Sequence, residues 1–370
     1  MISQRTGTTP NPWSFLPFAL TIFTSAFLLF QVQPLLSKQI LPWFGGSPAV
    51  WTTAMLFFQT LLCLGYLYAD ALAKVPCRQT QARIHVVLLV VAALLASRVL
   101  PGTELRPESP DSPVFQVLLI LGAGVGLRYF CLATTGPLVQ HWFTSTAHAS
   151  SVFRLYALSN VGSFLALLSF PYVLEPWLEQ QEMGQLWTAG FWVFALLCLP
   201  VALGAWQNKA QIGATQGNGP ESSSAVAVED LGHSAQTSFA QRFSWVALPA
   251  LASLVFIAAT DQISHDVAPE PRLWISTLGL YLVTFILTFD HPRWYRPKLF
   301  AFLTLVLLLV TAGMSDIPRW LGIEWDYGVN EVRWSHFALL FVVCMLCHGE
   351  LYRRRPVDTR RLTEFYLCMS

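Results

Sequence analysis

One basic side chain lies in the middle of an apolar stretch. Arg128 directly follows the glycine-rich segment Leu121–Leu127 (LGAGVGL), and apolar residues continue on both sides. A charge in such a position is costly in lipid, so it normally faces a cavity or a partner and marks a functional position. Arg128 is therefore a candidate for holding an anion or carboxylate in a central pathway. The alternatives are a structural ion pair, or a side chain that extends toward the membrane interface.

Further polar side chains lie within other apolar stretches. Gln31, Gln33 and Lys38 surround Pro34, a residue that leaves a helix carbonyl without its usual donor. Such groups could line a substrate entrance, because helix breaks are tolerated where they border a cavity. The alternative is hydrogen bonding between helices, with Lys38 at the interface. Asn160 has the same two interpretations, a pathway residue or a packing hydrogen bond.

Two short segments have the composition of a metal or haem site. Asp261, His265 and Asp266 combine carboxylates with an imidazole, as in a proton relay or a metal site. Four ligands at a recognisable spacing are absent, so no metal is predicted. The segment Cys344–His348 (CMLCH) spells the attachment string of a c-type haem. The charge pattern given below assigns it to the cytoplasmic side, whereas haem is attached on the outer side, so no cofactor is expected.

A basic run follows that string. His348 and Glu350 precede Arg353, Arg354 and Arg355. These residues could anchor a helix end or contact a cytoplasmic domain. The arginines could also attract anionic lipid head groups, at about 1 kcal/mol for each cation near such a surface. No motif for nucleic-acid binding accompanies them.

The elements that carry these residues must be membrane helices. Of the 370 residues, 54% are hydrophobic and only 12% are charged. The mean hydropathy is +0.50. Soluble domains carry roughly 25% charged residues, so the solvent for most of this chain is lipid. The first apolar stretch is too long for a signal-peptide core and lacks a small-residue cleavage site, so it is expected to remain as a membrane span.

Ten stretches are expected to cross the bilayer, because a membrane helix needs about 20 apolar residues. The predicted fold is therefore all-α, a polytopic transmembrane helix bundle of about ten helices. The stretches are roughly 15–37, 48–70, 84–100, 114–137, 153–173, 184–206, 243–260, 273–289, 298–314 and 335–351.

Lysine and arginine residues concentrate in alternate loops. Fifteen belong to the termini and the loops after even-numbered stretches: Arg5, Lys74, Arg78, Arg83, Arg154, Lys209, Arg242, Arg293, Arg296, Lys298, Arg353, Arg354, Arg355, Arg360 and Arg361. Six belong to the other loops: Lys38, Arg98, Arg106, Arg272, Arg319 and Arg333. Because cytoplasmic loops carry the excess of cations, this bias predicts ten spans with both termini in the cytoplasm.

The chain is expected to divide at residues 207–241, which are rich in Gly, Ser, Gln and Ala and are typical of a flexible linker. Residues 1–206 form a first unit of six helices, and residues 242–352 form a second unit of four. Residues 353–370 are interpreted as a basic cytoplasmic tail followed by the start of a truncated apolar segment.

Several strings, in order along nearly the whole chain, resemble one bacterial family. They are FQVQPLLSKQILPWFGGSPAVWTT (30–53), LGYLYAD (64–70), RLYALSNVGSFLALLSFPYVLEP (154–176), LWISTLGLYLVTFIL (273–287), and HGEL with RRRP and LTEFYL (348–367). The chain is similar to the membrane-embedded N-terminal part of the fused major-facilitator/spermidine-synthase proteins. One departure is Ser276 and Thr277, where that family tends to have a proline.

The resemblance implies a plan like that of the major facilitator superfamily, with six helices, a long cytoplasmic loop and six more. Six helices, a linker and four helices fit this plan with the last two missing. In the family, a soluble domain similar to spermidine synthase follows. Its glycine-rich loop and substrate-binding acidic residues have no counterpart here, so no enzymatic activity is expected of this chain.

Two functions follow as hypotheses. The first is a transporter-like domain in the bacterial inner membrane that handles a polyamine or another small metabolite. Against a polyamine stands the lack of intramembrane carboxylates at mid-depth. The second is a membrane anchor or subunit that does not transport and instead holds a soluble synthase-like enzyme, of the aminopropyltransferase or methyltransferase type.

Overall fold

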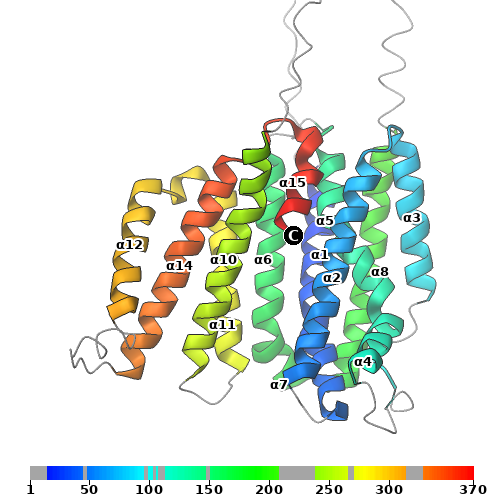
Figure 1. Ribbon diagram of the computed structural model, residues 1–370. Coiled ribbons are helices and arrows are strands. Elements are labelled where there is room, and N and C mark those ends of the chain that lie inside the picture. The colour runs from blue at the N-terminus through cyan, green and yellow to red at the C-terminus, as the bar shows by residue number, and fades with distance from the viewer. Residues whose placement is uncertain are drawn as a thin grey trace, which may run out of the picture.

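The protein is a bundle of helices. The structure is a computed structural model that describes residues 15–44, 48–95, 99–102, 106, 113–146, 151–207, 238–265, 271–313 and 328–370. Within these residues every regular element is helical, which confirms the all-α class. Successive long helices run up and down side by side (Figure 1).

The first unit precedes the linker and the second unit follows it. The first unit contains α1 (Leu16–Ile40), η2 (Leu41–Phe44), α2 (Pro48–Ala73), α3 (Arg78–Leu94), α4 (Pro113–Leu121), η4 (Gly122–Gly126), α5 (Leu127–Phe143), α6 (Val152–Ser169), η6 (Phe170–Leu174), α7 (Glu175–Trp177) and α8 (Gln180–Gln207). The second unit contains α10 (Phe239–His265), α11 (Pro271–Asp290), η7 (Pro292–Trp294), α12 (Pro297–Gly313), α14 (Val329–Arg353), η8 (Thr359–Arg361) and α15 (Leu362–Met369). Most of the expected linker, residues 208–237, lies outside the described residues.

Eight helical stretches within the described residues are long and apolar enough, by length and composition, to cross a membrane. Each of the ten predicted stretches coincides with a helix, but α3 and α11 are not among these eight, and the apolar part of α11 is only Trp274–Asp290. The expected stretch 84–100 was also displaced, because α3 begins at Arg78. Hydropathy locates only the apolar residues, whereas Arg and Gln are good helix formers that extend α3 toward its start.

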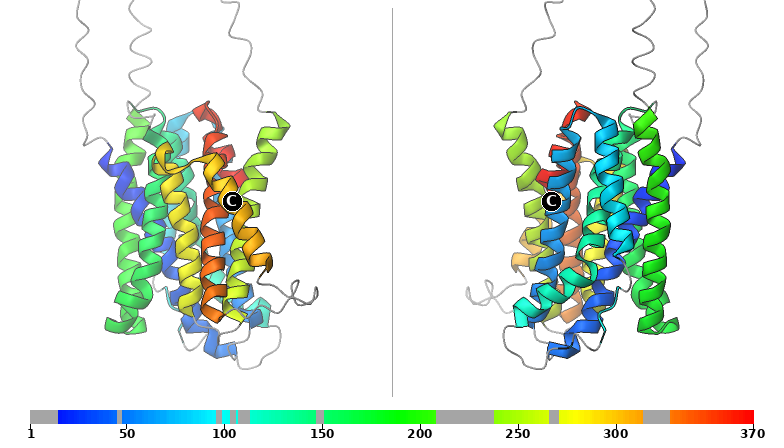
Figure 2. Two further views of the ribbon diagram at one scale, coloured as in Figure 1. Left: turned by 90° about the vertical axis from the view of Figure 1, so that its left-hand side faces the viewer. Right: turned by 90° about the vertical axis from the view of Figure 1, so that its right-hand side faces the viewer.

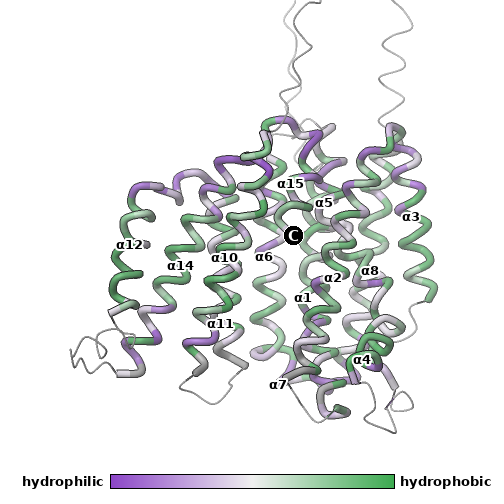
Figure 3. The backbone as a smooth tube through the Cα atoms, in the orientation of Figure 1, coloured by the Kyte–Doolittle hydropathy of each residue, from purple (hydrophilic) through white to green (hydrophobic). Residues whose placement is uncertain are grey.

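Apolar side chains cover the outside of the bundle as well as its core. Figure 3 shows hydrophobic residues along the helices and hydrophilic residues gathered toward the two ends. α12 has no buried residue, and its Phe302, Leu305 and Leu309 are exposed. Exposed apolar surface on this scale marks contact with lipid rather than with water. These features are consistent with a multi-pass integral membrane protein.

α6 stands at the centre of the packing. It packs against α1 within its own unit and against α11 of the second unit. Gly162 permits the close approach to α1, since a Cβ there would lie 2.8 Å from the carbonyl oxygen of Phe23. The two units lie side by side, so the bundle is broader in Figure 1 than in the side views of Figure 2.

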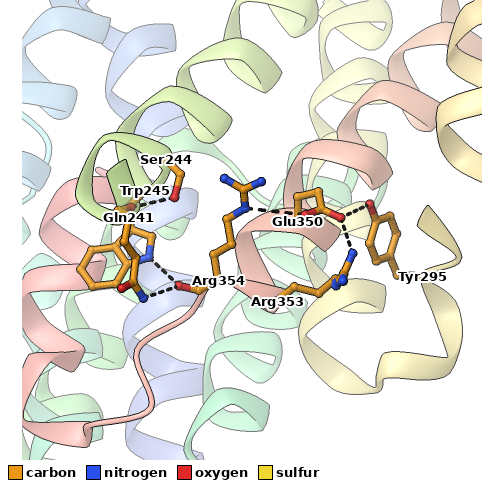
Figure 4. Close-up of polar contacts among 7 residues, drawn as sticks. All are labelled: Gln241, Ser244, Trp245, Tyr295, Glu350, Arg353 and Arg354. Carbon is orange, nitrogen blue, oxygen red and sulfur yellow. Dashed lines mark hydrogen bonds and ion pairs between the residues drawn. The ribbon is translucent and has the colours of Figure 1, made fainter. Parts of the chain in front are cut away.

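The segment expected to be a basic tail turns back into the bundle. After α14 the chain reverses, and α15 packs against α2, α5 and α10 (Figure 1). The backbone oxygen of Arg354 accepts hydrogen bonds from Trp245 Nε1 at 2.7 Å and Gln241 Nε2 at 3.2 Å, which fixes the turn (Figure 4). Burial of Phe365 and Tyr366 accounts for this position, because both aromatic side chains leave contact with water. We call this end of the molecule, at the top of Figure 1, the α15 end.

Candidate functional site

Arg128 lies inside the first unit. It is the second residue of α5 and follows η4, a π-helical turn formed by the glycine-rich segment. Its side chain is buried, donates a hydrogen bond to the carbonyl oxygen of Gly124, and lies 5.4 Å from the ring centre of Trp187 on α8. A desolvated cation over an indole ring is stabilised by about 2 kcal/mol. A Cβ at Gly122 would meet no atom of another helix within 4 Å, so a close helix contact does not require glycine at this position.

The polar residues of α1 bind neighbouring helices. Gln31 Nε2 donates to the carbonyl oxygen of Ala166 at 3.0 Å and to Ser169 Oγ at 2.7 Å, both on α6. Gln33 Nε2 donates to the hydroxyl of Tyr129 on α5 at 3.1 Å. These are the interhelical hydrogen bonds of the packing interpretation.

Lys38 forms an ion pair near the end of α1. Its Nζ lies 2.5 Å from Glu175 Oε1, and the two side chains are 44% and 40% exposed. Surface ion pairs of this kind contribute at most about 1 kcal/mol. Lys38 therefore joins α1 to α7 through an exposed ion pair.

Asn160 lies where the two units meet. Its Nδ2 donates to the carbonyl oxygen of Tyr156, one turn earlier on α6, at 2.9 Å. Tyr156 and Phe164 share its face of α6, since positions four apart lie above one another. The ring of Tyr156 contacts that of Phe285 at 5.7 Å, and Phe164 approaches Gly279. Both partners belong to α11, so Asn160 lies on the face of α6 that packs against the second unit.

His348 is deeply buried, which corrects the expectation that it contacts the cytoplasmic face. Its Nδ1 lies 2.9 Å from Thr284 Oγ1, and its ring stacks on Phe285 at 3.5 Å. Tyr281 meets the same ring edge-on. α14 continues to Arg353, more than a turn beyond His348, so the histidine lies within the helix packing.

Glu350 contacts three side chains near the end of α14 (Figure 4). It accepts a hydrogen bond from the Tyr295 hydroxyl at 2.9 Å and from Arg353 Nη1 at 2.8 Å. Arg354 Nε lies 3.7 Å from its second oxygen. The carboxylate therefore anchors this helix end to the link between α11 and α12.

The remaining candidates lie only partly within the described residues. Asp261 is exposed near the end of α10, and the side chain of His265 and all of Asp266 lie outside the described residues. The described residues contain no group of three or more His, Cys, Asp or Glu able to hold a metal ion. Cys344 and Cys347 are buried thiols in the second unit.

Sequence reasoning missed the polar contacts of α15. Asp70 Oδ1, at the end of α2, accepts a hydrogen bond from Thr363 Oγ1 at 2.9 Å. The Tyr366 hydroxyl donates to Gln140 Oε1 on α5 at 2.6 Å. All four side chains are buried. The available signal was Asp70 itself, a carboxylate still within an apolar stretch, four residues before Lys74.

Comparison with known proteins identifies no family. The chain matches no protein-family model and no curated protein.

Proposed function

We propose that this chain is a carrier for a small metabolite, with polyamines as the first class to test. The observation that carries the proposal is Asn160, a buried amide between the two helical units. Carriers of this general plan hold their substrate near the bilayer midplane, at the interface between helical repeats. An amide there can both donate and accept hydrogen bonds to a substrate.

Aromatic rings around this position support a cationic substrate. The ring of Tyr156 on α6 contacts that of Phe285 on α11, Phe285 in turn contacts Tyr281, and Phe164 lies against Gly279. The faces of such rings attract ammonium groups. Asp70 is the only acidic side chain among the buried residues that the structure describes, and it lies near the α15 end and not beside Asn160. A monocation or a neutral metabolite therefore fits as well as a polyamine.

Orientation and family belong to the same proposal. Helices α2, α8 and α14 end at the α15 end, and α3, α6 and α10 begin there. Most of the lysine and arginine residues belong to the segments next to these helix ends. By the positive-inside rule this end faces the cytoplasm of a bacterial inner membrane. The resemblance to the membrane part of the fused major-facilitator/spermidine-synthase proteins agrees with this arrangement of two units.

Uptake by the purified full chain in liposomes tests transport. Radiolabelled putrescine, spermidine and a panel of amino acids are offered to wild type and to Asn160→Leu. We expect at least about tenfold slower uptake by the variant, because an apolar side chain leaves the polar groups of the substrate unpaired. Asn330→Leu is the matched control, since Asn330 is exposed at the start of α14. No uptake of any compound by the wild type would refute transport.

The alternative function, a membrane anchor for a soluble synthase-like enzyme, is favoured by one observation. The side chains of Arg353 and Arg354 remain 58% and 54% exposed although both face Glu350. Exposed cations at a helix end can bind an acidic protein surface. Copurification from native membranes in mild detergent tests this function. Recovery of a synthase-like enzyme that is lost with Arg353→Gln and Arg354→Gln together would support it, and recovery of none would count against it.

A further inference from the structure

The second unit has a half-open cavity at the α15 end. Its volume is about 270 Å³, and it lies where the end of α11, the start of α12 and the end of α14 come together. Its wall is mostly apolar and is formed by Thr288, Pro292, Tyr295, Pro297, Tyr352, Arg353 and Arg355. A pocket with apolar walls and two cations suits a ligand that is apolar at one end and anionic at the other.

The guanidinium group of Arg355 is positioned to bind an anion. Its Nη1 donates to the carbonyl oxygen of Tyr352 at 2.7 Å, and its guanidinium lies 3.9 Å from the centre of the Tyr352 ring and 5.1 Å from that of Phe153. Within the described residues no carboxylate pairs with it. A guanidinium has five donors in a rigid fork, so Arg355 retains donors that match a phosphate group.

The surrounding charge also favours an anion. Residues 290–298 and 350–355 carry six cationic side chains, Arg293, Arg296, Lys298 and Arg353 to Arg355, against two carboxylates. Glu350 is shared by Arg353, Arg354 and Tyr295 (Figure 4). Asp290 pairs with Arg154 at 3.6 Å. Both carboxylates are thus engaged, and the positive potential at the cavity is left uncompensated.

We propose that this cavity binds the phosphate head group of an anionic phospholipid. The position favours a lipid over a soluble phosphate compound, because α12, which bounds the cavity, is exposed to the bilayer along its length. Basic pockets between membrane helices are known to bind such head groups. Tyr352 lies at the end of α14 and Tyr295 just before α12, and aromatic residues at such helix ends are enriched where the helix meets the head-group layer. Arg355 contacts the phosphate, and the proline and tyrosine rings contact the glycerol and upper acyl chain.

Native mass spectrometry of the full chain in detergent tests the site. Phosphatidylglycerol and phosphatidylcholine are titrated separately, and the dissociation constants are compared. We expect one tightly retained phosphatidylglycerol per chain and about five- to tenfold weaker binding for Arg355→Gln, because one charged, hydrogen-bonded contact is lost. Arg355→Lys keeps the charge but loses the fork, so it is expected to lie between the two. This variant also provides the measurement if Arg355→Gln does not fold.

Arg360→Gln is the matched control, because Arg360 is exposed at the same end and does not line the cavity. It should change the affinity for phosphatidylglycerol by less than about twofold. An equal loss for Arg360→Gln and Arg355→Gln would overturn the proposal, since surface charge alone would then explain binding. Equal affinity for phosphatidylcholine would overturn it as well. Displacement of the lipid by the same concentration of glycerol phosphate would assign the site to a soluble phosphate compound and reject the lipid.

Discussion

His85 is buried in α3 with both ring nitrogens lacking a hydrogen-bond partner among the described residues. Its ring packs edge-on against Trp142 at 6.0 Å. The ring centre of Tyr68, whose hydroxyl also lacks a partner among the described residues, lies 6.3 Å from that of His85. A buried polar group without a partner costs about 1–3 kcal/mol, so this part of the first unit is a source of instability.

We therefore predict that His85→Leu stabilises the protein. The substitution removes the unpaired nitrogens and keeps an apolar side chain of similar size, so the thermal unfolding temperature in detergent should rise. His336→Leu is the control, because His336 Nδ1 contacts the carbonyl oxygen of Val332 at 2.7 Å and that contact would be lost. A lower unfolding temperature for His85→Leu would show that these nitrogens have a partner that contributes to stability.

At the residue scale the structure also separates two candidates that looked alike in sequence. Arg128 and Asn160 both interrupt apolar stretches. Arg128 contacts Trp187 within the first unit, whereas Asn160 lies between the units. Arg128 thus has an aromatic partner on α8, and Asn160 is the residue chosen for the transport experiment.

At the scale of elements, α6 and α15 connect the molecule. α6 lies between α1 and α11, and α15 lies between α2, α5 and α10. Both contact the two units, so each can transmit a relative movement of one unit to the other. The close α1–α6 contact at Gly162 is the part of this arrangement that a single substitution tests most directly.

Gly162→Ala is predicted to destabilise the bundle. The added Cβ would lie 2.8 Å from the Phe23 carbonyl oxygen, so α1 or α6 must shift, at a cost of about 1–3 kcal/mol. Gly204→Ala is the matched control in α8, because a Cβ there meets nothing within 4 Å and alanine favours the helix by about 1 kcal/mol. The thermal unfolding temperature in detergent should fall for Gly162→Ala only. Equal unfolding temperatures for the two variants would mean that α1 and α6 can move apart without loss of stability.

At the scale of the whole molecule, the alternation of the helices sets which loops share a side of the membrane. We predict that cysteines introduced at Lys74 and Asp358, in a variant whose native cysteines are serine, react with a membrane-impermeant maleimide only after cells are opened. A cysteine at Glu179, at the opposite end, should react in intact cells. All three positions are exposed. Labelling of Lys74→Cys and Glu179→Cys from the same side would contradict the topology.

The helices could be predicted because their cause is local. About 20 consecutive apolar residues are incompatible with water and must satisfy their backbone in a helix, whatever they pack against. Each of the ten stretches therefore coincides with a helix, and the error at α3 arose where polar helix formers extend the element beyond its apolar part. The charge pattern likewise predicted the alternation, because it depends only on which residues precede and follow each stretch.

Tertiary structure alone decided which polar groups meet. Thr363 and Asp70 are 293 residues apart, and Tyr366 and Gln140 are 226 apart, so no local pattern links them. Their pairing depends on how each helix is rotated about its axis, and lipid-exposed and buried faces are similarly apolar in a membrane protein. For the same reason the sequence determined that Arg128, Asn160 and His348 lie in membrane helices. Only the packing of those helices decided that Arg128 faces Trp187, that Asn160 lies between the units, and that His348 is buried beside Thr284.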